Sequence, residues 1–309
     1  MINENLRKKV LLRTSWISTI GNAVLSLAKI IVGLVAGSVA VLGDGIDSAT
    51  DVIISLVMIF TARIMTRPPS RKYVYGYEKA ESIATKILSM VIFYAGMQML
   101  FTTLQSLFSH APKALPSSIA IYVTVFSIVG KLGLAWYQYR QGERVNSSLL
   151  MANAKNMRND VIISLGVLLG LLFTFVFRLP VLDTVTGLIV SLFIIKSSVS
   201  IFMDSSVELM DGVKDVSVYQ KIFEAVEKVP GASNPHRVRS RQIGNLYMIV
   251  LDIEADGEIS LNEAHAIAEE VEDSIQAIVE NVYDIVVHVE PAGKHHDEEK
   301  FGVDKNMFS

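Results

Sequence analysis

The sequence contains no cysteine among its 309 residues. This absence excludes disulfide bonds and metal sites with thiolate ligands. Charged residues are scarce as well: they make up 19% of the chain, whereas soluble globular proteins carry about 25%. The net charge of −3 lacks the basic excess of nucleic-acid-binding proteins, so we expect no nucleic acid partner.

The chain is instead rich in apolar residues. Hydrophobic residues make up 51% of it, and the mean hydropathy is +0.41. Six apolar segments precede a more polar C-terminal region, and each has the roughly 20 residues that a bilayer requires. The sequence predicts an all-α transmembrane domain over residues 1–208 that contacts membrane lipids. The expected spans are 11–36, 40–65, 81–109, 115–138, 149–177 and 182–203.

Basic residues gather on one side of the predicted membrane domain. They concentrate in residues 7–13, 63–79 and 140–144, whereas the alternate loops hold few. The positive-inside rule therefore predicts that both termini are cytoplasmic. The first apolar stretch runs on to about Ala36 and more spans follow it, so we interpret it as a retained span and not as a signal peptide. We expect a multi-pass protein of the plasma (inner) membrane.

The region 209–292 has the alternation of a small α+β domain. Helical periodicity covers 218–229 and 260–279, and strand-like patterns cover 236–243, 246–255 and 283–291. Gly244–Asn245 predicts a hairpin turn, and Ser260 with Glu263 predicts a capping box. The order is αββαβ, which we interpret as ferredoxin-like or metallochaperone-like. The polar residues 293–309 are expected to be disordered.

Residues 43–52, GDGIDSATDV, place three aspartates inside the second apolar segment. A carboxylate there costs about 2.5–3.5 kcal/mol and is usually functional or paired. Asp47 and Asp51 are four residues apart and share one helix face, where a cation or a proton would relieve their repulsion. Alternatively, they occupy a water-filled vestibule or cap neighbouring helices. Asp44 lies nearer the end of the segment, and we expect it to face water as a bystander.

A second polar pair begins the fifth apolar segment. Asn156 and Asp160 are again four residues apart, while Asn153 and Asn159 point to other helix faces. Two helices that each offer such a pair could enclose one ion with four oxygen ligands and leave no polar group facing lipid. The predicted transport site is therefore Asp47, Asp51, Asn156 and Asp160.

These motifs resemble those of the cation diffusion facilitator family of divalent-metal/proton antiporters. The resemblance covers nearly the whole chain. It implies a homodimer whose tails dimerise in the cytoplasm, with one transport site in each protomer. It also implies metal export by alternating access, driven by proton entry. The motifs are GDGIDSATDVIISL, PPSRKYVYGYEKAES, NxxxDVIISLGVLLG, SLNEAHAIAEEVE and VVHVEP.

The departures from the family pattern concern histidine. Zinc-transporting members usually carry a histidine in one or both ion-binding pairs, whereas the matching residues here are Asp47 and Asn156. Oxygen-only sites suit Mn²⁺ better than Zn²⁺, so we expect Mn²⁺ first and Fe²⁺ or Zn²⁺ next. An accessory site after the second span is expected to be absent, because Ser70, Tyr73 and Tyr77 occupy its ligand positions.

The C-terminal domain offers further candidates through the same resemblance. Matching positions in the family bind metal at the dimer interface; ordinary solvated or hydrogen-bonded side chains are the alternative. Lys79 and Asp211 are candidates for an ion pair between the membrane region and the tail, or are simply solvated. The candidate ligands are His236, Asp252, His265, His288 and Glu290.

Ion exchange at such a site requires no enzyme chemistry and no cofactor. Burial and like charge favour protonation of the empty aspartates, so a divalent cation would displace protons and arriving protons would displace the cation. A non-transporting membrane metal sensor or assembly partner is the main alternative. An intramembrane hydrolase is disfavoured, because the chain has no HExxH or GxSxG context.

Overall fold

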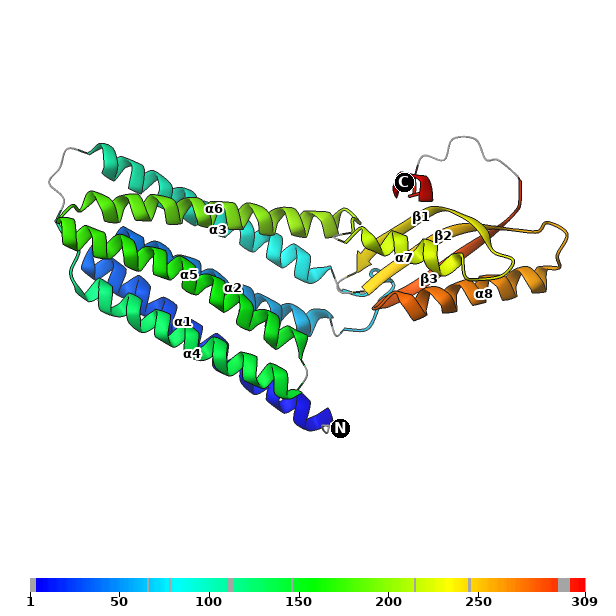
Figure 1. The fold of residues 1–309 in the computed structure, drawn as a ribbon, viewed down its shortest axis with the longest axis horizontal. Coiled ribbons are helices and arrows are strands. Elements are labelled where there is room, and N and C mark those ends of the chain that lie inside the picture. The colour runs from blue at the N-terminus through cyan, green and yellow to red at the C-terminus, as the bar shows by residue number, and fades with distance from the viewer. Residues whose placement is uncertain are drawn as a thin grey trace. The chain divides into compact units, whose positions relative to one another are not determined.

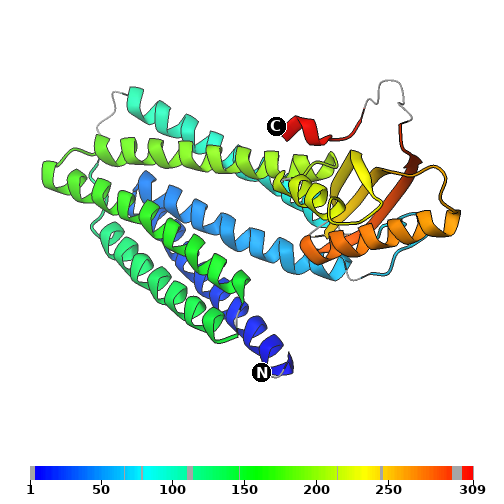
Figure 2. The same ribbon diagram turned by 45° about the vertical axis from the view of Figure 1, so that its right-hand side comes forward.

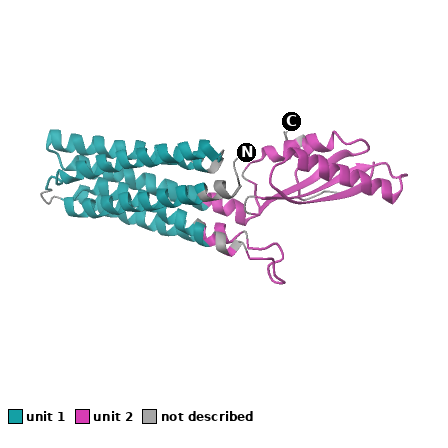
Figure 3. Ribbon diagram, turned by 90° about the horizontal axis from the view of Figure 1, so that it is seen from below, with its two compact units in different colours: residues 1–60, 87–202 teal, residues 61–86, 203–309 magenta. Residues whose placement is uncertain are grey.

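The protein is described by a computed structural model. The structure describes residues 4–65, 67–77, 79–109, 114–145, 147–213, 215–243, 246–293 and 301–308. The chain divides into two compact units (Figure 3). One unit comprises residues 1–60 and 87–202, and the other comprises residues 61–86 and 203–309.

Six long helices occupy the segments that the sequence predicts as apolar spans (Figure 1). A helix satisfies its own backbone hydrogen bonds, as a chain segment in lipid must. The helices are α1 (Glu4–Ala36), α2 (Val39–Met65), α3 (Ala80–Phe108), α4 (Ile119–Val145), α5 (Ser148–Phe177) and α6 (Val181–Leu209).

The sequence predicts six apolar spans, but only five of the described helices are long and apolar enough to cross a membrane: α1, α3, α4, α5 and α6. Helix α2 has 27 residues, which is sufficient length, but it carries Asp44, Asp47 and Asp51. These three carboxylates explain why α2 differs from its neighbours in composition.

Helix α4 packs against both α1 and α5, and the three helices lie side by side in two views (Figures 1 and 2). A buried apolar cluster joins α2, α3 and α6 through side chains that include Val41, Met99 and Val190. Two glycines flank Asp44 where α2 approaches its neighbours. A Cβ at Gly43 would lie 2.3 Å from Met99 Cε, and one at Gly45 would lie 2.9 Å from the backbone nitrogen of Ile30.

The connection from α1 to α2 is fixed by a buried carboxylate at the start of α6. Gly37 ends α1 with a φ of 70°, a left-handed conformation that glycine adopts without steric cost. Asp183 then accepts hydrogen bonds from Ser38 Oγ at 2.6 Å and from Val39 N at 2.8 Å. It thereby satisfies a backbone amide at the beginning of α2 that has no partner within the helix.

Residues 217–291 of the second unit have the predicted αββαβ order. Strands β1 and β2 are antiparallel, β2 and β3 are parallel, and the sheet order is β1-β2-β3. Both helices lie on one face of the sheet (Figure 3) and cover a core that includes Ile222, Ile249 and Val271. The predicted turn at Gly244–Asn245 lies outside the described residues. The elements are α7 (Ser217–Val226), β1 (Ser233–Ile243), β2 (Leu246–Ala255), α8 (Leu261–Ile278) and β3 (Val282–Pro291).

The C-terminal tail departs from the expected disorder over residues 301–308. Val303 forms an antiparallel bridge with Val238 of β1, with backbone hydrogen bonds of 3.1 and 2.9 Å. Asp304 accepts a hydrogen bond from the backbone amide of Arg237 at 3.0 Å, and a short 3₁₀ helix covers Lys305–Phe308. The free edge of β1 supplies the backbone partner, which the tail's polar composition alone does not reveal. Residues 294–300 lie outside the described part of the chain.

Candidate metal centres

Three of the four predicted transport-site residues line one cavity in the membrane unit. Asp51 comes from α2, and Asn156 and Asp160 come from α5. The cavity has a volume of about 310 Å³ and is also lined by polar residues of α1, including Asn22. The side chain of Asp51 is 45% exposed and that of Asp160 is 20% exposed. The cavity therefore presents oxygen atoms that an ion could reach.

Asp47 lies one turn before Asp51 on α2 and is half-buried. It is close enough to Asp51 and Asp160 for electrostatic interaction, but it does not line the cavity. The two predicted pairs are thus brought together by α2 and α5 without forming a closed four-ligand cage. Ion binding at all four residues would require Asp47 to turn toward the cavity.

A buried lysine joins the two aspartates of the cavity. Lys131 in α4 is 1% exposed, and its Nζ donates a hydrogen bond to Asp160 Oδ2 at 3.0 Å. The same nitrogen lies 3.8 Å from Asp51 Oδ2. One tethered positive charge therefore partly compensates two carboxylates that would otherwise repel each other.

Asp44 does not face water. It is 1% exposed, and its Oδ2 lies 2.7 Å from Nζ of Lys29, which is fully buried in α1. Lys29 also donates to Ser48 Oγ at 3.2 Å and Ser164 Oγ at 3.0 Å, and Ser164 donates to Asp44 Oδ1 at 2.8 Å. The network joins α1, α2 and α5, and Asp44 is not among the residues that line the cavity.

Sequence reasoning missed Lys29, Lys131 and Asn22. A single lysine within an apolar segment was the available signal, since an ionisable residue at membrane depth usually has a partner. Asn22 carries a second clue that only the structure reveals. Its Oδ1 is buried and accepts no hydrogen bond from the described residues, which leaves an amide oxygen free beside the cavity.

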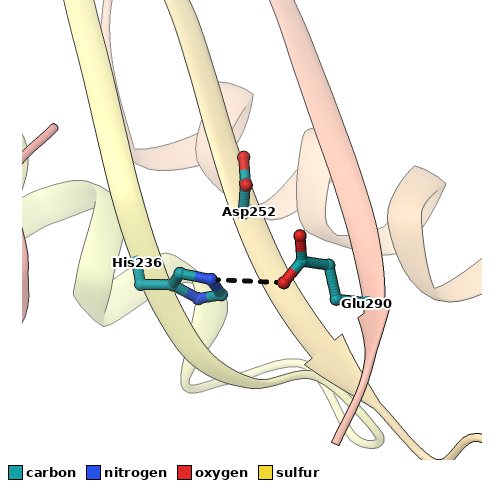
Figure 4. Close-up of side chains that lie close together, drawn as sticks. All are labelled: His236, Asp252 and Glu290. Carbon is teal, nitrogen blue, oxygen red and sulfur yellow. Dashed lines mark ion pairs between the residues drawn. The ribbon is translucent and has the colours of Figure 1, made fainter. Parts of the chain in front are cut away.

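The C-terminal sheet brings together three candidate metal ligands, His236, Asp252 and Glu290. Their ligand atoms all lie within 4.8 Å of one another, and no other group of three such side chains meets this limit among the described residues. Adjacent strands supply them, and His236 is the register partner of Asp252. Figure 4 shows His236 Nε2 facing Glu290, at 3.5 Å from its Oε2. A histidine nitrogen and two carboxylates are a donor set for a divalent cation.

The other two predicted ligands of this domain lie outside that group. His265 is on α8, where its side chain is 73% exposed and pairs with Glu269 at 3.4 Å. His288 contacts Glu290 Oε1 at 3.3 Å but is mostly exposed. Asp252 is buried, and its Oδ2 lies 3.1 Å from Arg237 Nη1 without hydrogen-bond geometry. A metal ion bound here would share the Asp252 carboxylate with the Arg237 guanidinium.

The candidate pair Lys79 and Asp211 is present as an ion pair of 2.5 Å. Both side chains are partly exposed, so the pair contributes little to stability by itself. In the preceding loop, the hydroxyls of Ser70 and Tyr77 lie 3.3 Å apart, and the rings of Tyr73 and Tyr77 are 4.8 Å apart. The three residues at the accessory-site positions thus contact one another as a small polar and aromatic cluster.

The long apolar helices, the acidic cavity between α2 and α5 and the αββαβ domain together define an integral membrane protein that handles cations. Residues 15–210 match the cation efflux transmembrane domain, and residues 215–292 match the cytoplasmic domain of cation efflux proteins. The chain belongs to the cation diffusion facilitator family. It is therefore a metal efflux transporter and not an enzyme.

The chain is 33% identical over 271 residues to the manganese efflux system protein MneS of Bacillus subtilis, covering 87% of this chain and 91% of that protein. It is 26% identical over 291 residues to MneP of the same organism, also a manganese efflux system protein, covering 92% and 97%. Among solved structures, the metal-bound C-terminal domain of the CzcD transporter from Thermotoga maritima is 36% identical. That match covers 26% of this chain and 94% of that one, with a TM-score of 0.26.

Proposed function

We propose that the protein exports divalent cations from the cytoplasm in exchange for protons, with Mn²⁺ as its first substrate and Fe²⁺ or Zn²⁺ next. The observation that carries this proposal is the cavity lined by Asp51, Asn156 and Asp160. Its candidate ligands are all oxygen atoms, which suit Mn²⁺ better than Zn²⁺. The similarity to two manganese efflux proteins supports the same order.

The transport cycle follows from the charges in this cavity. A metal ion arriving from the cytoplasm would displace protons from the aspartates, and protons from the other side would later displace the metal. Asn156 carries no titratable proton, so it would set geometry and selectivity while Asp47, Asp51 and Asp160 couple transport to protons. The protein would work by alternating access as a homodimer in the plasma (inner) membrane, with both termini and the αββαβ domain in the cytoplasm.

The test is uptake into proteoliposomes with Mn²⁺, Fe²⁺, Zn²⁺ and Cd²⁺ in parallel, with and without a pH gradient. We expect Mn²⁺ uptake to be the fastest and to depend on the gradient. Faster Zn²⁺ than Mn²⁺ uptake would contradict the assigned selectivity. Uptake of none of the four ions would contradict the proposed function itself.

A second candidate role, metal sensing by the C-terminal domain, is favoured by the cluster of His236, Asp252 and Glu290. In that case His236→Ala should weaken Mn²⁺ binding to this domain. The matched control is His265→Ala, since His265 is exposed and lies outside the group. Calorimetry on the full-length protein with Asp160→Asn in the membrane site would measure the C-terminal site alone. Equal affinities in both histidine variants would contradict this role.

A further inference from the structure

Lys131 is buried directly beside two of the aspartates that line the cavity. Its ammonium is 3.0 Å from Asp160 Oδ2 and 3.8 Å from Asp51 Oδ2, and the side chain is 1% exposed. The lysine comes from α4, whereas the two aspartates come from α2 and α5. Three helices therefore contribute to this cluster, and the cation among them is covalently attached to the protein.

Lys29 and Lys131, the two lysines that are buried among the described residues, are held differently. Lys29 makes two hydrogen bonds, to Ser48 and Ser164, and an ion pair with Asp44 at 2.7 Å. Among the described residues, Lys131 makes one hydrogen bond, to Asp160, and one longer contact, to Asp51. An ammonium with three donors and a single hydrogen bond is the more easily displaced of the two.

We propose that the Lys131 ammonium is the tethered counter-cation of the empty transport site and that the incoming divalent cation displaces it. This inference rests on the proposed function of the cavity. A hard divalent cation binds carboxylate oxygen at about 2.0–2.6 Å, closer than the 3.0 Å of the ammonium. With twice the charge at the shorter distance, its Coulomb attraction to the Asp160 carboxylate is about 2.3 to 3 times larger. The two cations would repel each other strongly if both remained among the same oxygens.

The tethered ammonium also explains how the site would discriminate by charge. Na⁺ and K⁺ carry the same charge as Lys131, but they must compete with a group held at high effective concentration beside the carboxylates. A divalent cation overcomes that competition because its charge is doubled. Lys131 is thus a specificity-determining residue that weakens binding of every cation and excludes monovalent ones.

Calorimetric Mn²⁺ titration of the full-length protein at fixed pH tests the proposal. The part of the binding curve that is present in the wild type and absent in Asp160→Asn reports Mn²⁺ binding at the membrane site. We expect Lys131→Met to tighten that component by about tenfold or more, because the competing ammonium is gone. Addition of NaCl should then weaken Mn²⁺ binding more in Lys131→Met than in the wild type.

Two control variants separate occupancy of the site from a general effect of charge. Lys131→Arg keeps the cation and should bind Mn²⁺ within about threefold of the wild type. Lys155→Met also removes one positive charge, from the residue before Asn156, but Lys155 is exposed. The Mn²⁺ affinity of this variant should therefore stay within about threefold of the wild type. Unchanged or weaker binding in Lys131→Met would overturn the proposal, as would equal tightening in Lys155→Met.

A structure of the wild-type protein in saturating Mn²⁺ decides the question even if a variant does not fold. We expect Lys131 Nζ to leave hydrogen-bonding distance of Asp160 when the metal is bound. A metal-loaded site in which this contact persists would overturn the inference but leave the proposed function intact. A wild-type protein that binds no divalent cation in the cavity would instead contradict the proposed function.

Discussion

Asn156 is the candidate ligand that separates a site for hard cations from a zinc site. It lies on α5 four residues before Asp160 and lines the same cavity. An amide oxygen cannot titrate and is a weaker ligand for Zn²⁺ than an imidazole nitrogen. The selectivity of the transporter should therefore respond to this one side chain more than to any of the aspartates.

Asn156→His should shift the preference from Mn²⁺ toward Zn²⁺, measured as the ratio of initial uptake rates in proteoliposomes. Asn159→His is the matched control, because Asn159 lies three residues further on and lines a different cavity. The control should keep the wild-type ratio. If both variants keep that ratio, Asn156 is not a ligand of the transported ion.

The sequence singles out Asp51 and Asp160, which the structure places in the lining of one cavity, but not the lysines buried beside the aspartates. Spacings of four residues place Asp47 with Asp51, and Asn156 with Asp160, on single helix faces. Lys131 stands alone in its segment, so its partner depends on how α4 packs against α2 and α5. Asp44 illustrates the same limit: its place near the end of the apolar stretch suggests solvent, whereas Lys29 buries it.

At the scale of the element, α2 depends on the glycines on either side of Asp44. Small residues let helix backbones approach closely within membranes. Gly45 lies against the backbone of Ile30 in α1, and Ser26 of α1 donates to the Gly45 carbonyl at 2.9 Å. This close approach brings Asp44 within reach of Lys29. The Gly43-Asp44-Gly45 sequence therefore lets α2 pack closely against its neighbours, and it also contains the first of the three aspartates.

Gly45→Ala should destabilise the protein by about 1–3 kcal/mol, because the added methyl group would overpack the contact with α1. Thermal unfolding in detergent is the measurement, with metal uptake as a second readout. Gly166→Ala is the control, since a Cβ there meets no atom within 4 Å. A Gly45→Ala protein as stable as the control would show that α1 and α2 do not need this approach.

Helix α8 begins with the predicted capping box. The backbone N–H of Ser260 donates to Glu263 Oε2 at 2.8 Å, and Glu263 N donates to Ser260 Oγ at 3.3 Å. The hydrogen bonds from the Ser260 backbone and then its hydroxyl lower the pKa of Glu263. A lowered pKa in the folded state means that the stabilisation is present at neutral pH. It is lost as the pH falls below the ordinary glutamate value of about 4.3 and through the folded pKa.

Hydrogen exchange at the first turn of α8 in the full-length protein measures this effect. After correction for the intrinsic pH dependence of exchange, protection should fall as the pH drops below about 4.3. In Glu263→Gln the glutamine cannot titrate, so protection should lose this pH dependence. A wild-type protein with constant corrected protection across this range would contradict the capping account.

The elements of the C-terminal domain were predictable because their patterns are local. The alternating residues in 246–255 predict a strand, and Ser260 with Glu263 predicts a capping box. The structure confirms the strand and the capping box. The parallel pairing of β2 with β3 and the bridge from Val303 to Val238 are contacts between distant segments. Local periodicity carries no information about such contacts, so the sheet topology and the ordered tail needed the structure.

At the scale of the whole molecule, the chain carries two candidate metal centres of different chemistry. The membrane cavity offers only oxygen ligands and an attached ammonium, which suits a site that must release its ion. The C-terminal group adds an imidazole, and the Arg237 guanidinium lies 3.1 Å from its buried carboxylate oxygen, Asp252 Oδ2. This difference predicts that transport and regulation would be separable by mutation.

The central claim is that protons and a divalent cation exchange at Asp51 and Asp160. The most direct measurement is Mn²⁺ accumulation against its own gradient in proteoliposomes with an imposed pH gradient, while an internal dye follows proton movement. The wild-type protein should accumulate Mn²⁺ with opposite proton flow, and Asp51→Asn and Asp160→Asn should abolish both fluxes. Wild-type rates in either aspartate variant, or Mn²⁺ transport without proton movement, would contradict the account.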